Sequence, residues 1–374
     1  MDMQANVSVV AKARSIGPRL AELSVLADRS GDFVAESYRI LKEQRLFSAA
    51  IPEELGGGGA SYEELCEMLR VMAHACPSTS LALSMHTHLV AVAVWRHRHG
   101  QPAAELLKKI ASDELVLVST GAGDWLESQG RAVRVEGGYV VNARKRFASG
   151  SPAGDLTMTS APYDDPEKGP EVLHFALPLR GPGVRVGDDW DTLGMRATGS
   201  HTVTFEDVFV PDSAITARRT RGTWHPMFSL ICTVALPLIV STYLGIGEKA
   251  SELAIEPAKR KASDPTVVFA IGEMERALLV ARMAWRELVE GVQDYEVVPT
   301  VEIASGALAR KAIAAESLER CVKKAVEAVG GAAFYRSNPL ERLWRDIQAV
   351  HFHPLPDKKQ LELGGRVALG LSPA

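Results

Sequence analysis

The chain has 374 residues, of which 46% are hydrophobic and 24% charged, as in an ordinary globular protein of two or three domains. Its net charge of −4 is small for this length, which argues against nucleic acid or an anionic membrane as a partner. Cys66, Cys76, Cys232 and Cys321 show no CxxC pair and no metal-ligand spacing, so we expect reduced thiols and no metal site. Because residues 1–20 also lack the apolar core of a signal peptide, we expect a cytoplasmic protein.

Residues 1–112 are helical in character and predict an N-terminal helical domain. Their leucines recur at steps of three and four residues, which is the spacing of amphipathic helices. Four consecutive glycines at 56–59 predict a loop, because glycine is unfavourable inside a helix. Ser61, with Glu64 three residues later, has the capping-box pattern that begins a new helix. A further helix is expected over residues 78–100.

The pattern then changes from helix to strand and back to helix. Short β-branched segments separated by glycine or proline turns predict a central β domain over residues 113–215. Residues 216–374 return to long helices, broken near Pro265 and at 330–331, and predict a C-terminal helical domain. The apolar run Leu230–Ile246 contains polar residues and continues into a charged segment, so we expect a buried helix and no membrane span. The fold class is therefore α+β.

The stretch Trp190–Pro211, WDTLGMRATGSHTVTFEDVFVP, is a polar loop broken by Gly194 and Gly199 that leads into an apolar strand. It suits one wall of a cleft backed by a sheet, and an ordinary hairpin entry is the alternative. LGMRATGSHTVTFEDVFVP resembles the central signature of the acyl-CoA dehydrogenase superfamily of flavoenzymes, and further matches recur along almost the whole chain. The resemblance implies two helical domains around a small barrel-like sheet, a homotetramer, and FAD or FMN as cofactor. Arg196 and Ser200 are then candidates for substrate binding.

The resemblance implies flavin-binding segments. In ELVLVSTGAGDW, Ser119, Gly121 and Gly123 would allow the backbone to approach a planar ring, although neighbouring residues depart from the family pattern. In NARKRFASGS, Phe147 takes the place of an aromatic residue against the ring and Ser149 that of a hydroxyl near flavin N5. Plain core packing is the alternative for Phe147.

A third segment, AVEAVGGAAF, contains Gly330 and Gly331. The resemblance implies that their backbone reaches a pyrophosphate, commonly of a neighbouring subunit's cofactor, and a helix C-cap is the alternative. Glu327 stands where the family often has glutamine, which is why FMN stays open beside FAD. Arg260 falls where the family often has a phosphate-contacting arginine.

An acyl-CoA dehydrogenase needs a glutamate base, which the family carries at one of two places. The equivalent positions here are Pro354 and Ala235, and neither side chain can be a base. HFHP instead resembles the tail of the oxygen-using branch of the family, which includes dibenzothiophene monooxygenase and has a histidine where His353 falls. A second histidine of that branch fits His88 better than His86.

Monooxygenases of that branch receive reduced flavin from a separate reductase, and an imidazole that titrates near neutrality can exchange protons with a substrate. The sequence therefore favours a flavin-dependent monooxygenase of a small organic substrate that uses His88, Ser149 and His353. If the segment is extended, His351 points the same way as His353. An acyl-CoA or acyl-carrier dehydrogenase with an unlocated base is the alternative, and a flavin-free scaffold is a third hypothesis. Four tryptophans are candidates for an aromatic pocket or for the core: Trp95, Trp125, Trp190 and Trp224.

Overall fold

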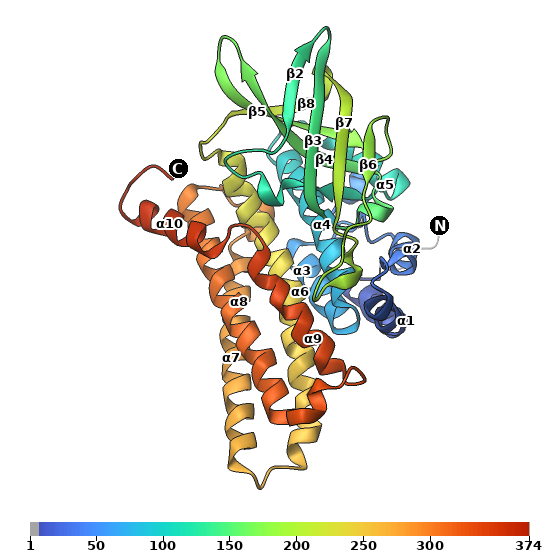
Figure 1. The fold of residues 1–374 in the computed structure, drawn as a ribbon, viewed down its shortest axis with the longest axis vertical. Helices are drawn as coiled ribbons and strands as arrows, with labels where there is room; N and C mark the ends of the chain where they lie inside the picture. Colours follow the sequence, from blue (N-terminus) through green and yellow to red (C-terminus); the bar gives the residue numbers. More distant parts are fainter. Residues whose placement is uncertain (1–6, 374) are drawn as a thin grey trace.

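The computed structural model describes residues 7–373 and arranges them as helices, then strands, then helices (Figure 1). The first helices are α1 (Val9–Ser30), α2 (Ala35–Glu43), α3 (Tyr62–Ala75), α4 (Pro77–Arg98) and α5 (Ala104–Asp113). The strands are β1 (Leu117–Ser119), β2 (Arg131–Val135), β3 (Gly138–Ala148), β4 (Leu156–Asp165), β5 (Gly169–Pro178), β6 (Val184–Val186), β7 (His201–Pro211) and β8 (Ile215–Thr220). The last helices are α6 (Pro226–Lys259), α7 (Pro265–Glu290), α8 (Val301–Val329), α9 (Pro339–Ile347) and α10 (Asp357–Ala368). The predicted fold class is confirmed, whereas the domain limits at residues 112 and 215 stay predictions.

Local sequence signals explain where several helices begin. The Ser61 hydroxyl accepts a hydrogen bond from the Glu64 backbone N–H, and the Glu64 carboxylate accepts one from the Ser61 N–H at 3.0 Å. This is the capping box that the sequence predicts at the start of α3. Pro265 occupies the first turn of α7. The N–H groups of a first turn have no partner within the helix, so proline loses no hydrogen bond there.

The strands of the described chain form two four-stranded sheets, with the orders β1-β4-β5-β8 and β2-β3-β7-β6. Every pair is antiparallel except β1 with β4. The inward side chains of both sheets, among them Val141, Phe175 and Phe205, pack into one core. Burial of each such side chain stabilises the folded protein by about 1.5–3 kcal/mol. The loops at one end of this β layer face the helices (Figure 1).

Helix α6 runs from the β layer down the length of the helical bundle formed with α7 and α8 (Figure 1). Within residues 7–373 it is the one helix long and apolar enough to cross a membrane, but 89% of its most apolar window is buried inside the protein. Leu238, Val240 and Leu244 are each 1% exposed or less. The buried helix predicted from Leu230–Ile246 is therefore a central helix of the bundle.

The loop over residues 190–200 is held against α9 and leads into β7, as the sequence predicts. A Cβ at Gly194 would lie 2.2 Å from the Arg345 carbonyl oxygen, so only glycine permits this approach. At the next residue, the Met195 N–H donates to the Asp346 carboxylate at 2.6 Å. Asp346 is 2% exposed, so this bond is formed away from water.

Asp346 should make stability depend on pH in an unusual direction. Burial raises the pKa of its carboxyl group from 3.8 to about 6. Between these values the folded protein keeps a proton that the unfolded chain releases, so the free energy of unfolding falls as pH rises from about 4 to about 6. Asp346→Asn keeps an oxygen acceptor for Met195 and removes the titration. We expect the variant to gain stability relative to the native protein, by up to about 3 kcal/mol, between pH 4 and pH 7.

Urea unfolding of both proteins at the two pH values measures this difference. An equal pH dependence of the unfolding free energy in the two proteins would contradict the assignment.

Candidate active site

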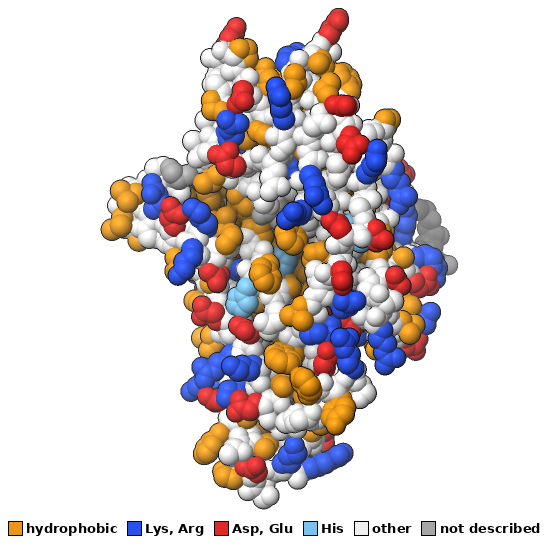
Figure 2. Space-filling model, viewed as in Figure 1, with side chains coloured by type: hydrophobic (Ala, Val, Ile, Leu, Met, Phe, Trp, Pro, Cys, Tyr) orange, Lys and Arg blue, Asp and Glu red, His pale blue; other side chains and the backbone are white. Residues whose placement is uncertain are grey.

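A cavity of about 580 Å³ lies where the β layer meets the helices, and its volume is that of a typical small-molecule site. Its helical walls come from α4, α5, the first half of α6 and the segment after α9, and its other walls come from β1, β4, β5, β8, the end of β3 and the 190–200 loop. Phe147, Leu193 and Phe352 line it and are 54%, 64% and 80% exposed, which places them at its rim. Figure 2 shows hydrophobic side chains and histidine gathered on this face, between the β layer and the bundle.

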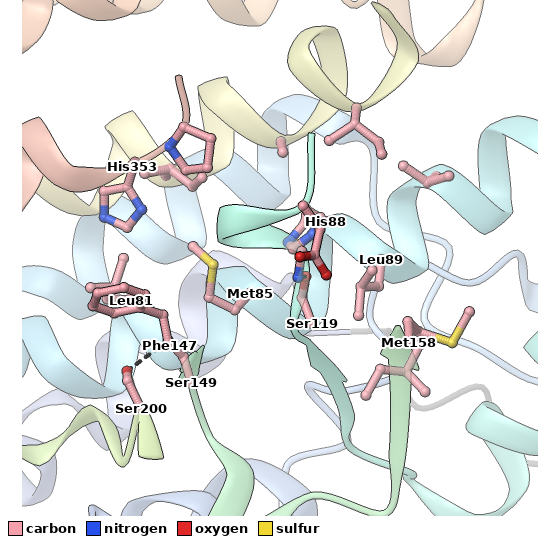
Figure 3. Close-up of a pocket in the computed structure, with 18 of the residues that line it drawn as sticks. Leu81, Met85, His88, Leu89, Ser119, Phe147, Ser149, Met158, Ser200 and His353 are labelled. Atoms are coloured by element: carbon pink, nitrogen blue, oxygen red, sulfur yellow. Dashed lines mark hydrogen bonds between the residues drawn. The ribbon is translucent and has the colours of Figure 1, made fainter. Parts of the chain in front are cut away.

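One face of α4 forms a long wall of the cavity. The lining residues recur at steps of three and four: Leu81, Met85, His88, Leu89, Val92 and Arg96. In Figure 3, Leu81 lies at one end with Phe147 and Ser149, while Leu89 lies at the other end with Met158. The order of the lining residues along α4 is therefore also their order along the cavity.

His353 lines the cavity, and two residues outside the lining, Tyr243 and Lys311, bind its ring and its backbone. Its Nε2 lies 2.6 Å from the hydroxyl of Tyr243, and its carbonyl oxygen accepts from the Lys311 ammonium at 3.3 Å. The Tyr243 hydroxyl has no other partner among the described residues, and it is fully buried, so we assign it as the donor to Nε2. His353 then carries its hydrogen on Nδ1. Burial, helped by Lys311 and His88, lowers the pKa of His353 to about 3, so the ring is neutral.

His88 faces the same cavity from α4. Its Nδ1 lies 3.3 Å from the Ser84 carbonyl oxygen, which can only accept, so Nδ1 carries the hydrogen and Nε2 has a free lone pair. Burial lowers the pKa of His88 to about 4. His86 differs, because both of its nitrogens bind backbone, Nε2 the Phe47 oxygen and Nδ1 the Leu117 N–H. Of these two histidines, His88 is the one that lines the cavity.

A third histidine, His174 on β5, lines the cavity and was missed by the sequence analysis. Its Nε2 accepts from the Arg219 guanidinium at 3.1 Å, which fixes the hydrogen on Nδ1 because arginine only donates. Burial, with Arg219 nearby, lowers the pKa of His174 to about 4. A histidine inside the apolar strand VLHFALP was the available signal.

Three hydroxyls form a chain that ends at the cavity. Thr198 donates to the Met195 carbonyl oxygen at 3.0 Å, so its oxygen must accept from Ser200 at 2.7 Å. The Ser200 hydrogen is then used, so Ser200 accepts from Ser149 at 2.8 Å (Figure 3). Ser149 therefore presents only acceptor lone pairs to the cavity, which it lines together with Ser200.

An irregularity in β3 directs Phe147 toward the cavity. The register of β3 against β7 shifts between Lys145 and Ala148, and Phe147 has a left-handed φ of 61°. Its ring meets Trp190 edge to face, with centroids 6.0 Å apart. Both rings line the cavity, so Phe147 is a wall of the site and not a core residue.

Charged groups on the cavity wall are mostly neutralised by the protein. Asp124 is the one carboxylate among the described lining residues, and the buried Lys145 ammonium pairs with it. The guanidinium of Arg345 pairs with Asp28 and Glu341 at 2.7 and 2.6 Å. Ala235 and Pro354, which the resemblance places where the family carries its glutamate base, both line the cavity. No unpaired carboxylate therefore reaches the cavity from the described residues.

Some predicted site residues lie elsewhere. Arg196 does not line the cavity, because its guanidinium donates to the Asp28 and Thr192 carbonyl oxygens at 3.0 Å each and links the loop to α1. The expectation that His351 points with His353 is wrong, because residues 348–352 form a 3-10 helix and His351 contacts Glu319 on α8.

The cofactor residues predicted from the sequence are divided between two regions. Ser119 and Gly121 line the cavity, and Gly123 follows them in the same short turn but is not part of the lining. Gly330 and Gly331 follow the end of α8, and Arg260 ends α6, roughly 30 Å beyond the last α6 residue that lines the cavity. Two of the four tryptophans, Trp125 and Trp190, line the cavity, whereas Trp95 and Trp224 do not.

The protonation states of the histidines can be measured directly. We expect ¹⁵N NMR of histidine-labelled protein to show His88, His174 and His353 neutral and with the hydrogen on Nδ1 from pH 8 down to about pH 5. Tyr243→Phe removes the donor to Nε2 of His353, so only that signal should change. A native His353 that titrates above pH 6, or that carries its hydrogen on Nε2, would contradict the geometry.

Comparison with known proteins identifies the family to which this chain belongs. Three models match in order: "Acyl-CoA dehydrogenase, N-terminal domain" over residues 6–114, "middle domain" over 121–208 and "C-terminal domain" over 239–357. Dibenzothiophene monooxygenase of Rhodococcus erythropolis is 26% identical, over 97% of this chain and 94% of that protein. A putative acyl-CoA dehydrogenase of Bacillus subtilis (strain 168) is 26% identical over 88% of both.

A solved structure similar to this one is KijD3 in complex with FMN and a dTDP-linked amino sugar. Its TM-score is 0.88 at 22% identity, over 99% of this chain and 95% of that chain. At this identity the likeness establishes the fold, which agrees with the order of the three family models. The chain belongs to the acyl-CoA dehydrogenase superfamily.

Proposed function

We propose that this protein is a flavin-dependent monooxygenase that uses reduced flavin and O2 to oxygenate a small organic substrate. The observation that carries the proposal is the composition of the cavity wall. Both positions that would hold a glutamate base are occupied by Ala235 and Pro354, and neutral imidazoles face the cavity instead. The similarity to dibenzothiophene monooxygenase over nearly the whole chain supports the same chemistry.

The cavity fits a flavin, either FMN or FAD. Phe147 and Trp190 offer aromatic walls to a planar ring, and the Trp125 indole N–H is a buried donor with no partner among the described residues. Ser149 offers only an acceptor, which matches N5 of a reduced flavin because that nitrogen carries a hydrogen. When bound, the flavin supplies the electrons that activate oxygen. Ser119, Gly121 and Gly123 would lie along its edge.

The protein's own contribution is to place hydrogen-bonding groups. All three histidines carry their hydrogen on Nδ1. The Nε2 lone pair of His88 is free to accept a hydrogen bond from the substrate, whereas Nε2 of His353 and of His174 is already occupied by Tyr243 and Arg219. The Leu81–Arg96 face of α4 and the apolar start of α6 exclude water from the reacting atoms. His88, Ser149 and His353 are the proposed catalytic residues, and Ser200 acts through Ser149.

Assembly and location follow from the same proposal. We propose a cytoplasmic homotetramer that receives reduced flavin from a separate reductase. Gly330, Gly331 and Arg260 are remote from the cavity of their own chain, so in this proposal they serve the cofactor of a neighbouring subunit. Exposed apolar side chains near the end of α8, such as Phe334 and Tyr335 at 77% and 70% exposure, are compatible with such an interface.

The alternative function is α,β-desaturation of an acyl-CoA or acyl-carrier thioester, which the similarity to the putative acyl-CoA dehydrogenase favours. It requires a base beside the flavin, and Asp124, the carboxylate on the wall, is bound to Lys145. A strongly paired carboxylate is a poor proton acceptor.

The two functions differ in what reduces the flavin. We expect flavin-loaded protein under anaerobic conditions to keep its visible absorption with a panel of acyl-CoAs, because no free base can remove the α-proton. After dithionite reduction and admission of O2 with indole as a probe substrate, mass spectrometry with ¹⁸O2 should find labelled product. Bleaching by any acyl-CoA within seconds, as in a dehydrogenase, would overturn the monooxygenase proposal.

The hydroxyl chain should set a preference for reduced flavin. Thr198→Val removes the acceptor for Ser200, so Ser200 can donate to Ser149 and Ser149 can donate into the cavity. We expect the ratio of the Kd values for oxidised and reduced FMN to fall by about tenfold in the variant. Anaerobic fluorescence titration measures both constants, and Thr198→Ser, which keeps the hydroxyl, is the control. The same ratio in native protein and Thr198→Val would contradict the proposed order of the hydrogen bonds.

A further inference from the structure

The cavity has one charge that the protein leaves uncompensated. Its charged lining residues are Asp124, Arg345 and Arg96 in the described chain. Asp124 pairs with Lys145, and Arg345 pairs with Asp28 and Glu341. Arg96 is half-buried, and its guanidinium has no hydrogen-bond or ion-pair partner among residues 7–373.

The surroundings of Arg96 make an unpaired guanidinium costly. Val92 and Ala93 precede it on the same face of α4, and Leu106 of α5, a helix that packs on α4, also lines the cavity. These side chains offer no acceptor, so binding that displaces water from this end would leave the cation without a partner. A ligand that carries an acceptor there, and above all an anion, removes that penalty. The planar guanidinium group of arginine can donate two parallel hydrogen bonds to a carboxylate, a sulfonate or a phosphate.

We propose that Arg96 binds an anionic group of the substrate, so that the natural substrate is an apolar, flat molecule with a negative charge at one end. This inference rests on the proposed function, because it assumes that the cavity that holds the flavin also holds the substrate. Arg96 lies eight residues beyond His88 on α4, which is roughly 12 Å along the helix axis. The charged group therefore lies at the end of the substrate opposite to the atom that reacts beside His88.

The apolar wall between the two residues defines the rest of the substrate. Leu89 and Val92 lie between His88 and Arg96 on the same face, and Met158 lies beside Leu89 in Figure 3. A hydrophobic ring system fits this part of the cavity, because burial of its surface is favourable at about 25 cal/mol per Å². The geometry thus separates a reacting end, an apolar middle and an anionic end.

Binding of matched neutral and anionic probes to FMN-loaded protein tests this assignment. The probes are indole and its 2-, 3- and 5-carboxylates, and calorimetry at low salt gives their Kd values. We expect native protein to bind at least one carboxylate about tenfold more tightly than indole, because a hydrogen-bonded ion pair replaces water at Arg96. Arg96→Met should lose this preference without weakening indole, and Arg96→Lys should keep part of it.

Two controls make the result specific. Lys109→Met removes an exposed positive charge from the neighbouring α5, outside the cavity, and should keep the carboxylate preference. The Kd values of FMN and riboflavin should be unchanged in Arg96→Met. The proposal is overturned if native protein shows no carboxylate preference, or if Arg96→Met retains it. It is also overturned if Arg96→Met loses its selectivity for FMN over riboflavin, because the anion would then be the flavin phosphate.

These measurements need neither oxygen nor a reductant, so their failure is distinct from failure of the monooxygenase proposal. Equal melting temperatures of native protein, Arg96→Lys and Arg96→Met exclude misfolding as the cause of a lost preference. If Arg96→Met does not fold, the partial loss in Arg96→Lys still decides the question.

Discussion

Burial of imidazoles in an apolar cavity is the constraint on which this account depends. His88, His174 and His353 lose water on folding, and this lowers their pKa values to about 4, 4 and 3. Each ring also has one nitrogen bound to a protein group, so its remaining nitrogen has a defined role. These pKa values contradict the expectation of imidazoles that titrate near neutrality. The neutral, oriented rings instead offer hydrogen-bond donors and acceptors to a substrate without bringing a charge into the site.

The scaffold fixes these groups from several directions. The face of α4 that carries His88 extends along the cavity, and the Tyr243 hydroxyl on the buried α6 is hydrogen-bonded to the His353 ring. The 190–200 loop is held against α9 through Asp346, and the hydroxyl chain from this loop determines what Ser149 can donate or accept. A few short hydrogen bonds thus connect the packed long helices to the side chains that face the cavity.

Features with a local physical cause could be predicted from the sequence. The capping box at Ser61, the buried α6 and the loop before β7 follow from nearby residues, and the family resemblance indicated the fold. The role of Arg196 could not be foreseen, because its partner on α1, Asp28, is 168 residues away along the chain. His351 was misjudged because a 3-10 turn replaces the expected extended segment. The pairing of Tyr243 with His353 depends on long-range packing that periodicity does not encode.

A crystal structure with reduced flavin bound tests the central claim most directly, because it shows which side chains face the reacting part of the ring. We predict that Ser149 accepts a hydrogen bond at the ring, that His88 and His353 border the space beside it, and that no carboxylate lies within about 4 Å of flavin N5. An aspartate or glutamate side chain in contact with that nitrogen, or a cavity wall that leaves no room for the ring, would contradict it.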